Sequence, residues 1–168
     1  MTRDQIDIIK KLYKYYPETG VLVRLKNGRV CFPDNEWRVA LYDSVLLPKM
    51  IRIKYIKLAW LLSRDEPLGY DYRLIQKDKN PNNFQARNLV KIHRLTYLEL
   101  KGAIRNLNGE LKVTSDTYDR YNSVVKYYNY KTKQYHKEIF EDSAMAKVRY
   151  NELRLKYSKL VNTYYVTS

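Results

Sequence analysis

A polar segment at residues 78–89, DKNPNNFQARNL, holds the residues whose types and spacing best suit chemistry. It places the carboxylate of Asp78 within a few positions of the carboxamides of Asn80, Asn83 and Asn88. Oxygen atoms of such side chains can bind a divalent cation, and the same groups also pin turns and cap helices. We expect the three asparagines to be structural, because a single carboxylate holds a metal ion weakly.

Cysteine and histidine offer little further chemistry. The chain has one cysteine, Cys31, so it can form neither an internal disulfide nor a zinc site built on cysteines. The two histidines, His93 and His136, lie far apart in the sequence. We interpret Cys31 as a small strand residue rather than a reactive thiol, and we expect neither a metal nor a cofactor.

The net charge of +14 is the strongest compositional signal. Lysine and arginine outnumber aspartate and glutamate in the first, middle and last parts of the chain, so the charge belongs to folded segments rather than to a tail. Such a surface favours nucleic acid as the partner, because each phosphate contact releases counterions. Among the 18 tyrosines we expect most to fill half-buried strand positions and the minority to stack on bases.

The elements that position these residues follow from periodicity. Residues 4–16 recur at helical spacing and predict a short helix that ends at Pro17. Alternation predicts strands at residues 21–26, 36–42 and 50–58, the first leading to a turn at Asn27–Gly28. Together they predict a small antiparallel sheet with one basic face, which supplies the first candidates for contacts with DNA: Arg52, Lys54 and Lys57.

The middle of the chain predicts short helices around an extended piece. The expected helices lie at residues 57–67, 82–89 and 95–106, and the extended piece lies at 72–77. We place a domain boundary in the polar stretch that follows, which divides the chain into residues 1–107 and 108–168.

The last third predicts a sheet and a helix. Strands are expected at residues 121–129 and 133–140, joined by a turn, and residues 110–115 are the candidate for a third strand. Residues 141–161 form the clearest helix, capped by Asp142 or Ser143. Its apolar stripe consists of Ala146, Tyr150, Leu153, Tyr157 and Leu160. The expected fold class is therefore α+β, with a small first domain followed by a sheet-plus-helix module.

Residues 12–97 resemble the HNH homing endonucleases of phage genomes. LYKYYPETGVLVRLK is similar to the family's N-terminal hairpin, IKLAWLL stands where the family has its first histidine block, and IQKDKNPNNFQARNL stands where it has the second. Asp78, Asn80, Asn83, Asn88 and Leu89 match the family's pattern. The resemblance implies a ββα frame of the HNH type.

The departures from that family lie at the catalytic positions. The metal ligand and the general base stand at Ile75 and Gln76, the second ligand stands at Tyr97, and the outer histidine stands at Ile56. Isoleucine offers no lone pair to a metal, and glutamine accepts no proton near neutral pH. The resemblance therefore implies a degenerate frame, and we predict that the chain is not an enzyme. His93 is the candidate for a displaced base.

The last third resembles the ethylene-response type of DNA-binding module, which is often appended to phage HNH endonucleases. The segment FEDSAMA at residues 140–146 is similar to the start of that module's helix. In that family a three-stranded sheet enters the major groove, and a two-stranded ribbon also fits there. The resemblance implies that the strands and their turn contact DNA through Lys126, Tyr128, Tyr130, Lys131, Lys133, Tyr135 and Lys137.

These observations favour a non-catalytic protein that binds double-stranded DNA, as a phage regulator or accessory factor. One alternative is a protein-interaction factor that acts on RNA polymerase, a host factor or a defence enzyme. Further alternatives are an active nickase with displaced catalytic residues and a protein that binds RNA. The apolar runs are too short to cross a bilayer and the N-terminus has no apolar signal core, so we expect no membrane and a cytoplasmic location, in the host cell if the chain is phage-encoded.

Overall fold

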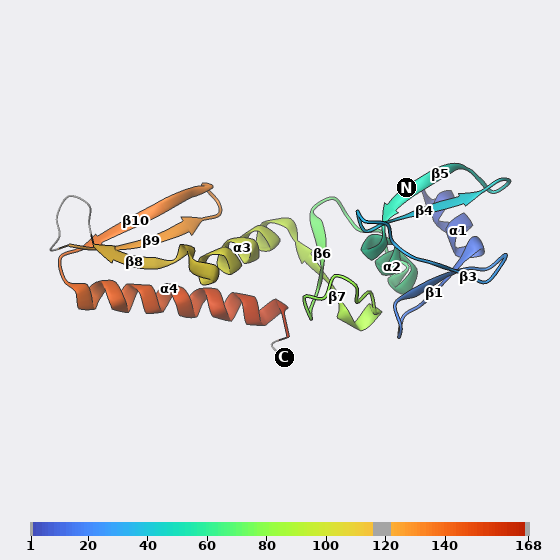
Figure 1. Ribbon diagram of the computed structural model, residues 1–168. Coiled ribbons are helices and arrows are strands. Elements are labelled where there is room, and N and C mark those ends of the chain that lie inside the picture. The colour runs from blue at the N-terminus through green and yellow to red at the C-terminus, as the bar shows by residue number, and fades with distance from the viewer. Residues whose placement is uncertain (1, 116–121, 167–168) are drawn as a thin grey trace. The chain divides into compact units, whose positions relative to one another are not determined.

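The computed structural model describes residues 2–115 and 122–166, and the chain divides into two compact units, residues 1–92 and 93–168 (Figure 1). The fold is mixed α+β. The first unit comprises α1 (Arg3–Leu12), β1 (Tyr13–Tyr16), β2 (Val21–Arg24), β3 (Arg29–Cys31), β4 (Arg38–Asp43), β5 (Leu47–Lys54), α2 (Tyr55–Arg64), β6 (Tyr72–Gln76), the 3-10 turn η1 (Ala86–Asn88) and β7 (Leu89–His93). The second comprises α3 (Arg94–Arg105), the turn η2 (Asn106–Glu110), β8 (Lys112–Ser115), β9 (Ser123–Asn129), β10 (Gln134–Phe140) and α4 (Ser143–Tyr164).

Helix α1 passes directly into strand β1. The helix begins with a capping box, in which the side chains of Thr2 and Gln5 accept each other's main-chain N–H groups. The helix expected over residues 4–16 is wrong in its last turn, which is the strand. The cause is tertiary, because Tyr13 and Tyr15 alternate with exposed residues, bury their rings in the core and pair with β2.

The turn between β1 and β2 packs tightly on a later segment of the first unit. A Cβ atom at Gly20 would lie 2.7 Å from the nitrogen of Gln85 and 2.7 Å from the carbonyl carbon of Phe84. The hydroxyl of Tyr55, at the start of α2, accepts the N–H of Leu22 at 2.8 Å and donates to the carbonyl oxygen of Gly20 at 3.0 Å. These contacts join the hairpin, α2 and the later segment around one core.

Helix α2 begins at Tyr55, so the strand expected over residues 50–58 is wrong in its last four positions. Strand β5 ends at Lys54, and Tyr55, Leu58 and Ala59 are then buried at helical spacing. Apolar and basic residues go on alternating in the sequence beyond Lys54, although the backbone there is helical and no longer extended.

Strands β4 and β5 pair antiparallel and present one basic face, as expected. The single sheet expected over residues 21–57 is wrong, because β2 pairs with β1 and β3 in a separate three-stranded sheet. The alternation in β4 is strict, with Val39 and Leu41 buried and Arg38 and Ala40 exposed. Arg38 pairs with Lys54, and Ala40 pairs with the residue two positions earlier in β5, Arg52. The exposed side chains of both strands therefore lie on the face away from the core.

The second unit is a three-stranded antiparallel sheet in the order β10-β9-β8, packed on α4 (Figure 1). Val125 is fully buried against Ala146 and Leu153 of the helix, and Tyr127 packs beside them. Asp142 caps α4, its carboxylate accepting the N–H of Ala144 at 2.7 Å. The strands expected in the last third, the candidate third strand and the helix are confirmed, although Tyr121, the first residue of the strand expected over 121–129, lies outside the described residues.

Helix α3 belongs to the second unit, so the division lies at residues 92–93 and not at 107–108. The helix packs against α4. The buried side chain of Asn106, directly after α3, forms two hydrogen bonds with the main chain of Tyr128 in β9. The described part of the polar stretch that suggested a boundary forms most of the turn η2 and strand β8 of the second unit, and its last residues, from 116 on, lie outside the described ranges.

Candidate functional site

The polar segment after β6 is a loop held together by its own side chains. The carboxylate of Asp78 accepts the N–H of Asn80 at 2.9 Å and the amide groups of Asn83 at 2.7 Å and Asn88 at 2.9 Å. Asn88 also accepts the N–H of Asp78 at 3.1 Å. Burial opposes ionisation, but these hydrogen bonds outweigh it and lower the pKa of Asp78. The asparagines therefore brace the loop, which contains one 3-10 turn where a helix over 82–89 was expected.

The positions aligned with HNH catalytic residues carry structural side chains. Ile75 is buried and Ile56 packs partly buried against the core. The amide of Gln76 donates to the carbonyl oxygen of Pro81 at 2.9 Å. His93 caps α3, its Nδ1 accepting the N–H of Leu95 at 3.3 Å, and Tyr97 lies on α3 beneath the ammonium of Lys101. Within residues 2–115 and 122–166 no three His, Cys, Asp or Glu side chains gather at metal-binding distance.

The structure brings Arg52 and Lys54 together on the exposed face of β4 and β5. Lys54 lies opposite Arg38, and Arg52 lies one exposed position further along β5. Lys57 is exposed on α2 and lines a shallow hollow that Arg52 also borders. The three candidates of the first unit are therefore neighbours, and Arg38 joins them.

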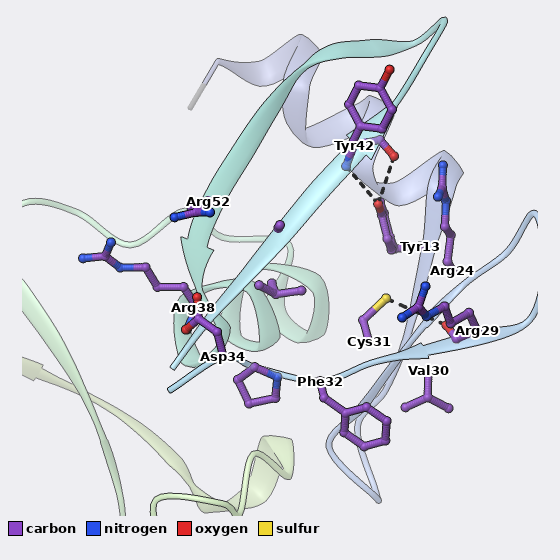
Figure 2. Close-up of a pocket in the computed structure, with 13 residues that line it drawn as sticks. Tyr13, Arg24, Arg29, Val30, Cys31, Phe32, Asp34, Arg38, Tyr42 and Arg52 are labelled. Carbon is purple, nitrogen blue, oxygen red and sulfur yellow. Dashed lines mark hydrogen bonds between the residues drawn. The ribbon is translucent and has the colours of Figure 1, made fainter. Parts of the chain in front are cut away.

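A larger hollow of about 720 Å³ lies beside this face, between β4, β5 and the segment from β3 to residue 34 (Figure 2). Figure 2 shows Arg38 and Arg52 on one side of it and Arg24 and Arg29 on the other. The remaining lining side chains are Tyr13, Val30, Cys31, Phe32, Pro33, Asp34, Val39, Ala40 and Tyr42. Burial raises the pKa of the Cys31 thiol, which fits a packing residue rather than a nucleophile.

In the second unit, three lysines lie side by side across the sheet. Lys126 of β9 pairs with Lys112 of β8 on one side and with Lys137 of β10 on the other. Paired residues of antiparallel strands project to the same face, with Cβ atoms about 5 Å apart. Because Val125 faces α4, its neighbour Lys126 and both partners project from the opposite face. We call these three residues the lysine row and this side of the sheet the outer face.

Two tyrosines and an arginine lie next to the lysine row on the outer face. Tyr128 and Tyr135 are cross-strand partners whose rings meet edge to face at 5.4 Å. The guanidinium of Arg105 lies 4.0 Å from the ring centre of Tyr128 and donates to the hydroxyl of Tyr135 at 2.9 Å. That hydroxyl donates to Glu110 at 2.8 Å, and the ammonium of Lys126 lies 4.8 Å from the Tyr135 ring centre.

The remaining candidates occupy the turn between β9 and β10 and are not gathered on the outer face. Tyr130 packs on α3, where a Cβ atom at Gly102 would lie 2.7 Å from that of Tyr130. Lys131 forms an ion pair with Glu99 at 3.4 Å. Lys133 is exposed and holds a left-handed backbone with φ of +57°. The structure thus separates these three from Lys126, Tyr128, Tyr135 and Lys137.

The outer face includes residues that sequence reasoning missed. Lys112 was not a candidate, although it belongs to the possible third strand. In the structure it pairs directly with Lys126. Arg105 precedes the turn η2 and gave no signal of its own, because its approach to Tyr128 depends on the packing of α3.

Comparisons of this chain with protein-family models, with curated proteins and with solved structures found no match. In the part of the chain that the structure describes, no helix combines the length and the apolar character that crossing a bilayer requires.

Proposed function

We propose that this chain is a non-catalytic protein that binds double-stranded DNA through the outer face of its C-terminal sheet. The lysine row is the observation that carries the proposal. Three ammonium groups on directly opposed positions repel one another and lower the stability of the sheet. A polyanion on this face would remove that repulsion, and the net charge of +14 favours nucleic acid as the polyanion.

The aromatic residues beside the row suit the edge of such an interface. Tyr135 is 43 % exposed, and Arg105 is held over Tyr128 by stacking, by its bond to the Tyr135 hydroxyl and by its ion pair with Glu110 at 3.2 Å. The Nη1 group of a guanidinium fixed in this way can donate to phosphate or to a base edge with little further loss of freedom. A three-stranded sheet on one helix also agrees with the module that the sequence resembles. The resemblance to phage endonucleases favours a regulatory or accessory role.

The experiment that tests the proposal is a titration of the full chain by fluorescence anisotropy with duplex DNA, single-stranded DNA and duplex RNA. We expect the tightest binding to duplex DNA and a steep fall between about 50 and 200 mM salt. Replacing the lysine row by glutamine, K112Q/K126Q/K137Q, should remove most of this binding. The matched control is K147Q/K156Q/K159Q, which removes the same charge from exposed positions on α4.

Three results would overturn the proposal. Equal losses in the two triple variants would mean that net charge and not the outer face sets the affinity. Preference for duplex RNA would change the partner. Cleavage of the recovered DNA in the presence of magnesium would show an enzyme, and H93A would then test the displaced base.

A second candidate function, docking on another protein, is favoured by one side of α4. Met145, Val148 and Leu155 are 55 %, 52 % and 57 % exposed, and their spacing places them on one side of the helix. At about 100° per residue this side lies roughly opposite the stripe of Ala146 and Leu153 that packs on the sheet. M145S/L155S should abolish salt-insensitive capture of a polymerase or host protein while DNA binding persists, if this candidate is correct.

A further inference from the structure

The hollow in Figure 2 carries more positive charge than its own carboxylates neutralise. Arg24 pairs with Asp43 at 3.3 Å, and Arg38 pairs with Glu36 at 2.8 Å. Arg29 and Arg52 form no ion pair with any residue in the described ranges 2–115 and 122–166. Arg29 and Arg52 therefore come from opposite sides of the hollow without a carboxylate partner, and with Asp34 counted the hollow retains a net positive charge.

The carboxylate inside the hollow is already engaged. Asp34 accepts the main-chain N–H groups of Glu36 at 2.9 Å and Arg38 at 2.8 Å, so it shapes the loop before β4. In addition, the Nε of Arg24 is buried and has no acceptor among the described residues. Because this atom is closed to solvent and Arg24 and Arg38 are ion-paired, Arg29 and Arg52 are the arginines of the hollow that are available to a ligand.

The rim of the hollow is aromatic. The ring of Phe32 is 78 % exposed and that of Tyr42 is 46 % exposed, and Figure 2 places them at opposite ends of the hollow. Exposure of a phenyl group costs free energy unless a ligand covers it, and aromatic rings are the usual platform for a nucleic acid base. The volume of about 720 Å³ lies in the range of small-ligand sites.

We propose that this hollow binds a nucleoside phosphate, with Arg29 and Arg52 holding the phosphate and Phe32 stacking on the base. The ligand is either a free mononucleotide or an unpaired nucleotide of a strand, since both present the same chemistry. A guanidinium group suits phosphate oxygens better than an ammonium group does, because its planar fork can donate two parallel hydrogen bonds. The site lies in the first unit and does not depend on DNA binding by the outer face.

The test is isothermal titration calorimetry on the full chain with thymidine 5′-monophosphate, thymidine, inorganic phosphate and a short 5′-phosphorylated oligothymidylate. We expect the monophosphate to bind more tightly than thymidine or phosphate. R29Q and R52Q should each weaken it about tenfold, and F32A should do so by a similar factor while leaving phosphate binding unchanged. K49Q and V45A are the controls, because both residues are exposed near the same hairpin and neither lines the hollow.

The outcomes separate the sources and the proposals. Tighter binding of the oligonucleotide, with the same losses in R29Q, R52Q and F32A, identifies a strand nucleotide as the ligand; equal or weaker binding identifies a free nucleotide. K112Q/K126Q/K137Q should retain monophosphate binding even if the proposed DNA interface is wrong. Equal affinity for phosphate and monophosphate, no response to R29Q and R52Q, or no binding at millimolar ligand would overturn the inference.

Discussion

The carboxamide of Asn106 pairs with the main chain of Tyr128 in the manner of an adjacent strand. Its oxygen accepts the N–H of Tyr128 at 2.8 Å, and its nitrogen donates to the carbonyl oxygen of Tyr128 at 2.9 Å. Asn106 is only 2 % exposed, so water cannot replace these bonds. The pairing fixes the end of α3 at β9, and Arg105 is thereby held over the Tyr128 ring.

N106A should therefore destabilise the second unit and the outer face together. The substitution leaves a donor and an acceptor of Tyr128 without partners in a buried place, at a cost of about 3 kcal/mol in the free energy of unfolding. Chemical denaturation measures this loss. N108A, at an exposed position in the same turn, should change stability by less than about 0.5 kcal/mol. Equal effects of the two variants would contradict a specific role for the Asn106 pairing.

Two glycines with similar backbones should respond differently to alanine. Gly20 and Gly28 have φ of +75° and +65°, so both substitutions incur the cost of a left-handed alanine, about 1 kcal/mol. A Cβ atom at Gly20 also meets main-chain atoms at 2.7 Å, whereas nothing lies within 4 Å of one at Gly28. G20A should therefore be at least about 2 kcal/mol less stable than G28A by thermal or urea unfolding. Equal losses of stability in G20A and G28A would show that the main chain at Phe84 and Gln85 moves to accommodate the added methyl group at little cost.

The buried hydroxyl of Tyr55 makes the first unit sensitive to alkaline pH. Burial raises its pKa to about 12, while the unfolded chain ionises near 10. Below pH 10 the full stabilisation is present, and it is lost as the pH rises from about 10 through about 12, because the unfolded state releases the proton first. Y55F should lose about 1–2 kcal/mol at pH 7, from the unpaired groups of Gly20 and Leu22, and should decline less steeply above pH 10.

Melting temperatures across pH 7 to 11 test this prediction. Y16F is the control, since the Tyr16 ring is 39 % exposed. If the melting temperature of Y55F fell with rising pH as steeply as that of the wild type, the alkaline sensitivity would belong to other tyrosines.

The ion pair between Glu138 and Arg149 predicts an acid-sensitive attachment of α4. Arg149 donates to both carboxylate oxygens of Glu138, at 2.8 and 3.1 Å, and this interaction lowers the pKa of Glu138. The stabilisation is present above the unfolded pKa of about 4.3 and is lost as the pH falls through the lower folded value. E138Q should lose about 1 kcal/mol at pH 7 and progressively less below pH 4. Unfolding curves from pH 3 to 7 measure the difference in free energy of unfolding between the wild type and E138Q. The control is E141Q, because Glu141 is exposed.

Relief of charge repulsion in the lysine row should stabilise the protein while weakening DNA binding. Lys137 is exposed and lies opposite Lys126, so K137Q should raise the free energy of unfolding by about 0.5 kcal/mol at low salt. High salt screens the repulsion and should remove the difference. K147Q is the control on α4. A K137Q protein that is less stable at low salt would mean that another partner compensates the charge of Lys137.

Much of the architecture is predictable because local signals agree with tertiary packing. The turn at Asn27–Gly28 and the cap at Asp142 lie where residue type predicts them. Strand β1 and the start of α2 were not predicted. The backbone conformation at Tyr13 and Tyr55 depends on contacts of their rings and hydroxyls with residues distant in the sequence. No periodicity within a segment contains that information.

The candidate sites show the same division. Lys126 and Lys137 were predictable as one face of a hairpin, because register follows from the turn between the strands. The hollow in Figure 2 was not predictable, since its arginines come from β2, β3, β4 and β5 and only folding places them together. Tyr130 and Lys131 look equivalent to their neighbours in sequence, yet packing on α3 removes them from the outer face.

The lysine row also has a direction. Its three lysines lie on three adjacent strands, β8, β9 and β10, rather than along one strand. The line of charge therefore runs perpendicular to the strands and spans about 10 Å. A duplex whose axis follows this line would cross the strands, and the row would extend over about three base-pair steps at 3.4 Å of axis each. The footprint of the row is therefore short, and removal of its three charges should lower the slope of log affinity against log salt by about 3.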